Sequence, residues 1–92
     1  RHPLEVVVWQ NEEGGLIGSR VAAGELPARE LERVAVSGHT IRAGIARIGG
    51  DVARLDTARR TPDSLACYLE LHIEQGGTLE RERLPIGVVE GI

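Results

Sequence analysis

The 92-residue sequence has few of the residues that several common protein classes require. Its single cysteine, Cys67, excludes an internal disulfide framework and a cysteine-rich zinc site. No apolar run approaches the roughly 18–20 residues of a membrane span, so no membrane partner is expected. The net charge of −3 gives no electrostatic case for nucleic acid as a partner. With no signal-peptide pattern, the expected location is cytoplasmic.

Methionine and phenylalanine are absent, and aromatic residues make up only 2% of the chain. So few large side chains leave a thin core for a chain of this length. The sequence opens on Arg1-His2-Pro3 and closes on a strand-like run over residues 88–92. We therefore expect residues 1–92 to be a single segment of a larger protein, truncated at both ends.

Three short runs have the pattern of β-strands. Residues 4–9 form a β-branched apolar run, typical of a strand buried on both faces. Residues 65–74 alternate between apolar and polar types, which predicts a half-buried strand with Cys67 on its apolar face. Residues 86–89 predict a last short strand.

The region between the first two predicted strands carries the signals of several short helices. N-cap residues, a proline suited to a first helical turn and apolar residues at helical spacing mark them. The expected ranges are 20–23, 28–35, 41–48 and a last helix from the cap at 51 to 59 or 60, with N-terminal signals at Ser19, Pro27, Thr40 and Asp51 and a terminating Gly24. This order of strand, helices, strand and strand predicts an α/β fold.

Two polar clusters follow predicted strands at their carboxyl ends, where ligands bind in open α/β sheets. Asn11-Glu12-Glu13-Gly14 follows the first strand, and residues 72–76 end the alternating one. If both strands run parallel in one sheet, Glu12, Glu13 and His72 converge on one crevice. Carboxylates with an imidazole suit zinc, manganese or cobalt, and a second carboxylate can take a proton from the activated water.

Two other interpretations of these clusters remain open. The Glu-Glu pair and the histidine also fit solvated surface residues. The run Gly14–Ser19 has some features of a phosphate-binding turn between strand and helix. However, no lysine follows Gly18, and the two neighbouring carboxylates would repel a phosphate.

Several segments resemble, in order, one family, the N-carbamoyl-L-amino-acid hydrolases and allantoate amidohydrolases. This family belongs to the dinuclear metallopeptidase-like amidohydrolases, and the motif His72-Ile73-Glu74-Gln75-Gly76 is specific to this branch. The resemblance implies a partial three-layer α/β catalytic domain with about three strands and three to four short helices, without the lid domain. The matching segments are residues 3–14, 18–19, 68–76, 79–80 and 84–89.

The resemblance also implies a role for each matching residue. Glu13 and His72 are similar to ligands of two divalent ions (Zn, Mn, Co or Ni), and Glu12 to the general base. Gln75 would hydrogen-bond the carbamoyl group of the substrate, and Asn11 would position the loop. The implied enzyme hydrolyses non-peptide C–N bonds of N-carbamoyl-L-amino acids or allantoate-like ureides. It forms homodimers through the lid domain.

This sequence departs from the family pattern in ways that bear on activity. The remaining metal ligands of the family lie before and after these residues, so we expect the chain alone to be inactive. Only residues 15–17 separate Gly14 from Gly18, which is shorter than usual, and Gly77 replaces a proline. An alternative hypothesis is a non-catalytic remnant that self-associates or pairs with a partner chain through exposed sheet edges. A third is an unrelated small α/β binding domain.

Overall fold

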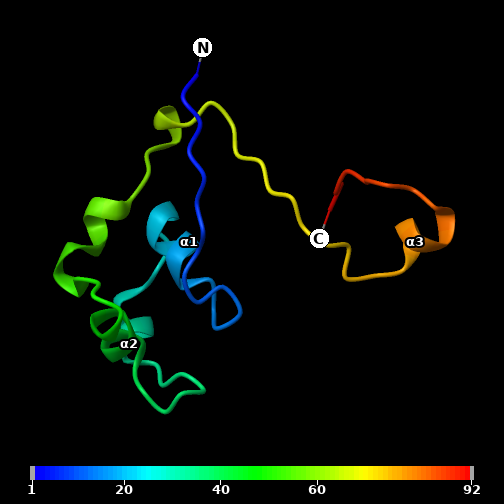
Figure 1. The fold of residues 1–92 in the computed structure, drawn as a ribbon. Coiled ribbons are helices and arrows are strands. Elements are labelled where there is room, and N and C mark those ends of the chain that lie inside the picture. Colours follow the sequence, from blue (N-terminus) through cyan, green and yellow to red (C-terminus); the bar gives the residue numbers. More distant parts are fainter. Residues whose placement is uncertain (1, 92) are drawn as a thin grey trace.

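The computed structural model describes residues 2–91, and six short helical elements form its regular structure. Helices α1, η1, α2 and η2 gather in one part of the molecule, and residues 65–91 extend away from it (Figure 1). No helix in the described part is long and apolar enough to cross a membrane. The elements are α1 (Ile17–Ala23), η1 (Ala28–Glu32), α2 (Ile41–Arg47), η2 (Val52–Ala58), η3 (Pro62–Ser64) and α3 (Thr78–Glu82), with η marking 3₁₀-helices.

The overall dimensions show that only part of the chain is compact. The radius of gyration of the Cα atoms is 16.6 Å, against about 12 Å for a compact domain of this length. The principal extents are 46 × 38 × 21 Å. The extra length comes from the segment that leaves the helical part after η3 (Figure 1).

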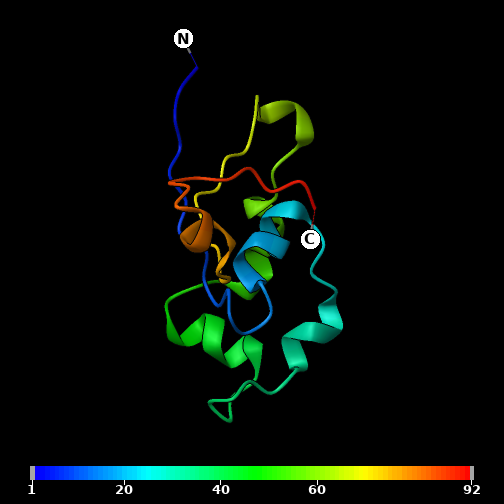
Figure 2. The same ribbon diagram turned by 90° about the vertical axis from the view of Figure 1, so that its right-hand side faces the viewer.

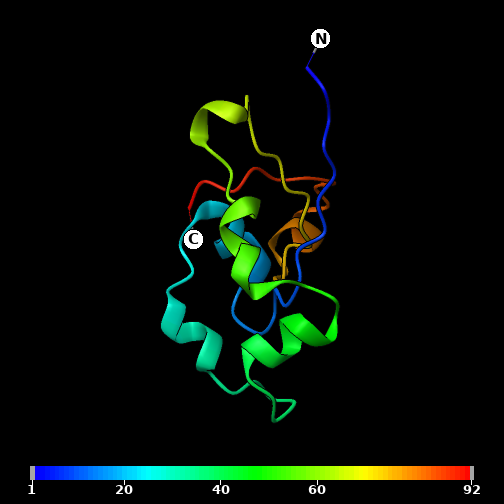
Figure 3. The ribbon, with the colours of Figure 1, turned by 90° about the vertical axis from the view of Figure 1, so that its left-hand side faces the viewer.

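The core lies where α1, η1 and α2 meet. Each contributes one buried side chain, namely Ile17, Leu31 and Ile41. Helix α2 packs against η1 and η2, and α1 packs against η2, as the two side views show (Figures 2 and 3). Partly buried apolar side chains surround this cluster: Leu26, Ala35, Ile45, Val52 and Leu55. The thin core expected from the composition is confirmed in the described residues.

Three of the helix boundary signals in the sequence are confirmed. Thr40 caps α2, because its Oγ1 accepts a hydrogen bond from the amide of Ala43 at 3.1 Å. Asp51 caps η2 in the same way, accepting from the amide of Ala53 at 2.9 Å. Gly24 ends α1 in the left-handed conformation, with φ of 75°. The helix expected after Asp51 is therefore present, but as a 3₁₀-helix.

The helix predicted over 28–35 is wrong in its length and type. A 3₁₀-helix ends at Glu32, and the chain then turns back on itself. Val34 forms an isolated antiparallel bridge with Thr40, and the amide of Ile41 donates to the carbonyl of Arg33 at 3.0 Å. The hairpin pairs backbone N–H and C=O groups that a longer helix would need for its own hydrogen bonds. The chain then leads directly into α2.

None of the three predicted strands is paired in the part of the chain that the structure describes. Residues 4–9, 65–74 and 86–89 are extended but lie in no ladder. Their apolar side chains are exposed, with relative exposures of 93% for Val6 and 91% for Leu71. A strand needs a neighbour for its backbone hydrogen bonds and covering helices for its side chains. The α/β fold is therefore not seen here, and the prediction of a buried Cys67 is wrong, since Cys67 is exposed.

Candidate functional site

The first polar cluster forms a tight loop at the start of α1. The carbonyl of Glu12 accepts a hydrogen bond from the amide of Leu16 at 3.0 Å, and that of Asn11 accepts from Ile17 at 3.4 Å. Asn11 and Leu16 have φ of 54° and 57°, in the left-handed region that residues other than glycine seldom adopt. The loop backbone is thus held in a specific shape around the two glutamates.

This loop, and not Ser19, starts the helix, so the predicted N-cap at Ser19 is wrong. Helix α1 begins at Ile17, and Ser19 lies in its first turn, where its Oγ donates to the carbonyl of Leu16 at 3.1 Å. The amide of Gly18 donates to the carbonyl of Gln10 at 3.0 Å. Carbonyl groups of the loop therefore accept hydrogen bonds from amides of the first helical turn, which a capping side chain would otherwise do.

Arg33 anchors the loop to the helical part of the molecule. Its Nη2 donates to the carbonyl of Gly14 at 2.6 Å, while its Nε pairs with Glu30 at 3.0 Å. Gly15 has φ of 123°, and a Cβ there would lie 2.6 Å from Arg33 Nη2. The positive φ favours glycine at this position, and the flexible end of Arg33 closes over the space that a side chain would take. Sequence reasoning missed Arg33, because no motif connects it with a loop 19 residues earlier.

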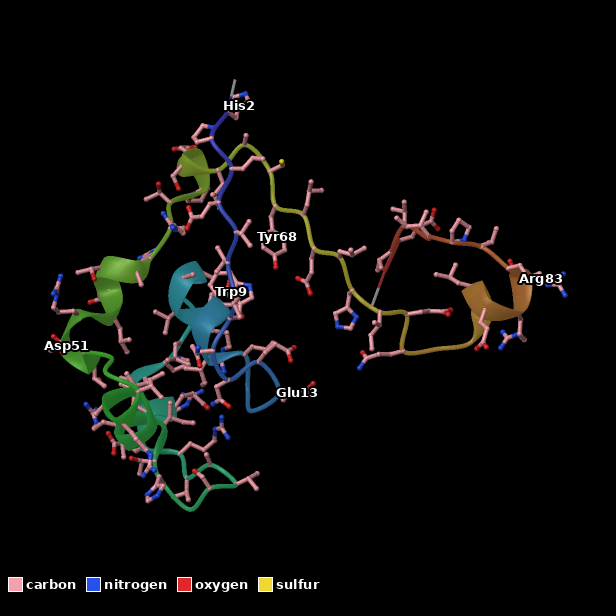
Figure 4. The ribbon with its side chains drawn as sticks, in the orientation of Figure 1. His2, Trp9, Glu13, Asp51, Tyr68 and Arg83 are labelled. Carbon is pink, nitrogen blue, oxygen red and sulfur yellow. The ribbon has the colours of Figure 1, made fainter. Side chains whose placement is uncertain are left out.

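Glu12 and Glu13 lie on the exposed part of this anchored loop. Both residues are exposed, and Figure 4 shows Glu13 on the outer side of the loop, away from the helices. The loop therefore presents two neighbouring carboxylates from a backbone that is fixed on its other side. Such an arrangement leaves both carboxylates free to bind a cation or accept a proton.

The second polar cluster follows the extended segment 65–74. His72 Nδ1 hydrogen-bonds to the carbonyl of Ile73, and because a carbonyl only accepts, Nδ1 carries the proton. This bond leaves Nε2 as the ring nitrogen that can bind a metal, which is the arrangement that histidine ligands usually have in metal sites. Gln75 has φ of 51°, so a second predicted site residue lies in the left-handed region.

Glu74 has a structural role that the sequence analysis did not assign. Its Oε1 accepts hydrogen bonds from the amides of Thr78 at 2.8 Å and Leu79 at 3.1 Å. It thereby caps α3, a helix that was not predicted. A carboxylate just before the start of a helix is favoured by the helix dipole, and that signal was available in the sequence.

The structure does not bring the two clusters together. The loop over 11–15 lies beside α1, and the turn over 75–77 lies in the segment that extends away (Figures 1 and 4). Among the described residues, no group of three or more His, Cys, Asp or Glu is able to hold a metal ion. Glu13 and His72 have suitable donor atoms, but two ligands on separate loops do not complete a site. Their convergence stays a prediction.

Several named proteins match the chain over nearly its whole length, although no protein-family model matches it. It is 45% identical over 96 residues to an N-carbamoyl-L-amino acid amidohydrolase of Geobacillus stearothermophilus, covering 99% of this chain. An N-carbamoyl-L-amino-acid amidohydrolase of Paenarthrobacter aurescens is 39% identical over 98 residues, covering all of it. The chain belongs to the N-carbamoyl-L-amino-acid amidohydrolase and allantoate deiminase family. A probable allantoate deiminase of rice (Oryza sativa subsp. japonica) is 38% identical over 97 residues, 98% of this chain.

Membership of this amidohydrolase family confirms the resemblance read from the motifs, and it makes the chain part of an enzyme family. The chain spans about a quarter of the length of these relatives: 24% of each bacterial protein and 20% of the rice protein. The alignments run over 96 to 98 residues for a chain of 92, so the relatives have residues without a counterpart here. A shortened loop between Gly14 and Gly18 would account for such a difference.

Proposed function

We propose that this chain supplies the general base and two metal ligands to an amidohydrolase active site. The observation that carries the proposal is its 45% identity, across almost every residue, to a protein named an N-carbamoyl-L-amino acid amidohydrolase. The rice relative is named as a probable allantoate deiminase. The proposed substrate class is therefore a carbamoyl or ureido compound whose non-peptide C–N bond is hydrolysed by water.

The proposed roles follow from the donor atoms that each loop presents. The Glu13 carboxylate and His72 Nε2 would hold a divalent cation, which when bound would polarise the substrate carbonyl and make water more acidic. Glu12 would accept a proton from the attacking water. Gln75 would donate its amide N–H to the carbamoyl oxygen. Asn11, with its left-handed backbone, would keep the two glutamates turned outward.

The proposed fold for this function is the three-layer α/β catalytic domain of the metallopeptidase-like amidohydrolases. The extended segments 4–9, 65–74 and 86–89 would pair in its sheet, and α1, η1, α2 and η2 would cover one face. This proposal is supported by the strand pattern of these segments and by the apolar side chains that they expose. Pairing would bury side chains such as Val6 and Leu71.

A second candidate is a non-catalytic chain that associates with itself. The specific observation in its favour is the exposure of apolar side chains along the extended segments, 96% for Leu4 and 91% for Val88. Unpaired extended segments of this kind readily pair with other chains. Light scattering that shows a discrete oligomer without metal or substrate binding would favour this candidate.

The proposed function predicts that the segment works inside a relative. In a chimaera, this chain replaces the aligned part of the Geobacillus stearothermophilus amidohydrolase, and hydrolysis of an N-carbamoyl-L-amino acid is measured. We expect activity in the chimaera and its loss in the Glu13→Ala variant, because a ligand is removed.

The control for that experiment is Glu82→Ala in α3, an exposed carboxylate outside both clusters. It should keep the activity of the chimaera. A chimaera with the circular dichroism of the parent enzyme but no turnover would contradict the proposal. Equal activity of the Glu13→Ala and Glu82→Ala variants would also contradict it.

A further inference from the structure

A chain of hydrogen bonds links the two segments that precede the polar clusters. Trp9 Nε1 donates to the Tyr68 hydroxyl at 3.4 Å, and that hydroxyl donates to Glu70 Oε2 at 2.6 Å. Figure 4 shows the Tyr68 ring directed toward the segment that carries Trp9. These are the only tryptophan and the only tyrosine of the sequence. The contact joins residues 59 positions apart.

The linked residues occupy matching positions relative to the proposed site. Trp9 lies four residues before Glu13, and Tyr68 lies four residues before His72. The segments 4–9 and 65–74 both start at the top of Figure 1 and run downward, moving apart along their length. The contact therefore lies at the end of residues 4–9, directly before the loop that carries Glu13, and four residues before His72 on the second segment.

The alternation of side chains along a strand also relates the linked residues to His72. In an extended strand, Tyr68, Glu70 and His72 share one face, because side chains alternate with a period of two.

A second contact, the ion pair between Glu5 and Arg60, joins the first segment to the chain shortly before the second segment begins. The two contacts occur in the same order along both parts of the chain, so residues 5–9 and 60–68 run in the same direction.

We propose that Trp9, Tyr68 and Glu70 form a register clamp that sets the parallel alignment of residues 4–9 and 65–74. In a paired sheet, the clamp would set the ends of the two segments at one edge, where Glu13 and His72 follow, and its three residues would be positioning residues that touch neither substrate nor metal. This inference rests on the proposed function, since it gives the clamp a purpose in the metal site. It goes beyond that function, because it assigns the alignment to three specific side chains.

The experiment compares the purified chain with its Tyr68→Phe variant, which keeps the ring and removes the hydroxyl. The emission of the single tryptophan reports the contact itself without any metal. A calorimetric titration with zinc reports the alignment of Glu13 and His72. We expect a shifted emission of Trp9 and a zinc affinity lowered roughly threefold to tenfold, the effect of one lost hydrogen bond network.

A double-mutant cycle and a matched control sharpen the test. Trp9→Phe should weaken zinc binding to a similar extent, and adding Tyr68→Phe should weaken it little further, since both remove the same link. Ser37→Ala removes an exposed hydroxyl from the hairpin and should change neither readout.

The possible failures are distinguishable. Unchanged Trp9 emission in the Tyr68→Phe variant contradicts the contact, and changed emission with unchanged zinc affinity contradicts its positioning role. Zinc binding that survives in the Glu13→Ala, His72→Ala double variant contradicts the proposed function instead.

Discussion

Replacing Glu12 with glutamine in the chimaera is expected to lower kcat by about 10²–10⁴-fold, the usual contribution of a general base. Glutamine has nearly the same shape as glutamate, but its amide cannot accept a proton from the attacking water. The Glu12 side chain is exposed, and its backbone carbonyl is the group that holds the loop, so the backbone shape should persist. KM should change little, since the loss falls on the transition state. Steady-state hydrolysis of an N-carbamoyl-L-amino acid gives both constants.

Glu82→Gln is the matched control for this substitution. It makes the same chemical change on an exposed residue of α3, and it should leave kcat within a factor of about two, as expected for surface positions away from the site. A Glu12→Gln chimaera with nearly full kcat would show that another group takes the proton. An equal loss in both variants would show a general disturbance of the fold.

Leu31→Ala is expected to lower the free energy of unfolding by about 2–5 kcal/mol, the range for removing a large buried aliphatic side chain. Leu31 is 8% exposed and is one of three buried residues in the described core. Whole domains are stable by only about 5–15 kcal/mol. In so small a core, we expect the variant with this loss to show little cooperative unfolding. Urea unfolding followed by circular dichroism measures it.

Val36→Ala serves as the comparison for the core substitution. Val36 lies in the hairpin between η1 and α2 and is fully exposed, so its truncation should change stability by less than about 0.5 kcal/mol. A Leu31→Ala variant that unfolds at the same urea concentration as Val36→Ala would contradict the location of the core.

The helical part of the fold was largely predictable because its signals are local. Thr40 and Asp51 satisfy amides two or three residues further along, and Gly24 adopts its left-handed conformation at a position that the sequence marks. A helix closes its hydrogen bonds within itself, so short stretches of sequence determine where it begins and ends. The hairpin that shortened η1 depends on the pairing of Val34 with Thr40, which local signals do not contain.

The strands were not predictable from local signals in the same way. The pattern of residues 4–9 and 65–74 indicates which residues suit a sheet, but a strand exists only when a neighbour takes its backbone groups. The described residues provide no such ladder. For the same reason Cys67, placed on the apolar face of a strand, is exposed.

The family was predictable from the motifs, whereas the geometry of the candidate site was not. Motifs around Glu12 and His72 pointed to the correct family, which the relatives confirm. The anchoring of the first loop by Arg33 and the capping of α3 by Glu74 depend on contacts that no motif contains. The position of Glu13 relative to His72 depends on sheet pairing, and so it stays a prediction.

The most direct test of the account is a calorimetric titration of the purified chain with zinc and with manganese. The comparison proteins are the double variant Glu13→Ala, His72→Ala and the control His39→Ala, Glu82→Ala, which removes an exposed imidazole and carboxylate elsewhere. The account predicts weak binding by the original chain and the control, and its loss in the Glu13 and His72 variant. Identical heats from all three proteins would contradict the claim that these two loops form one metal site.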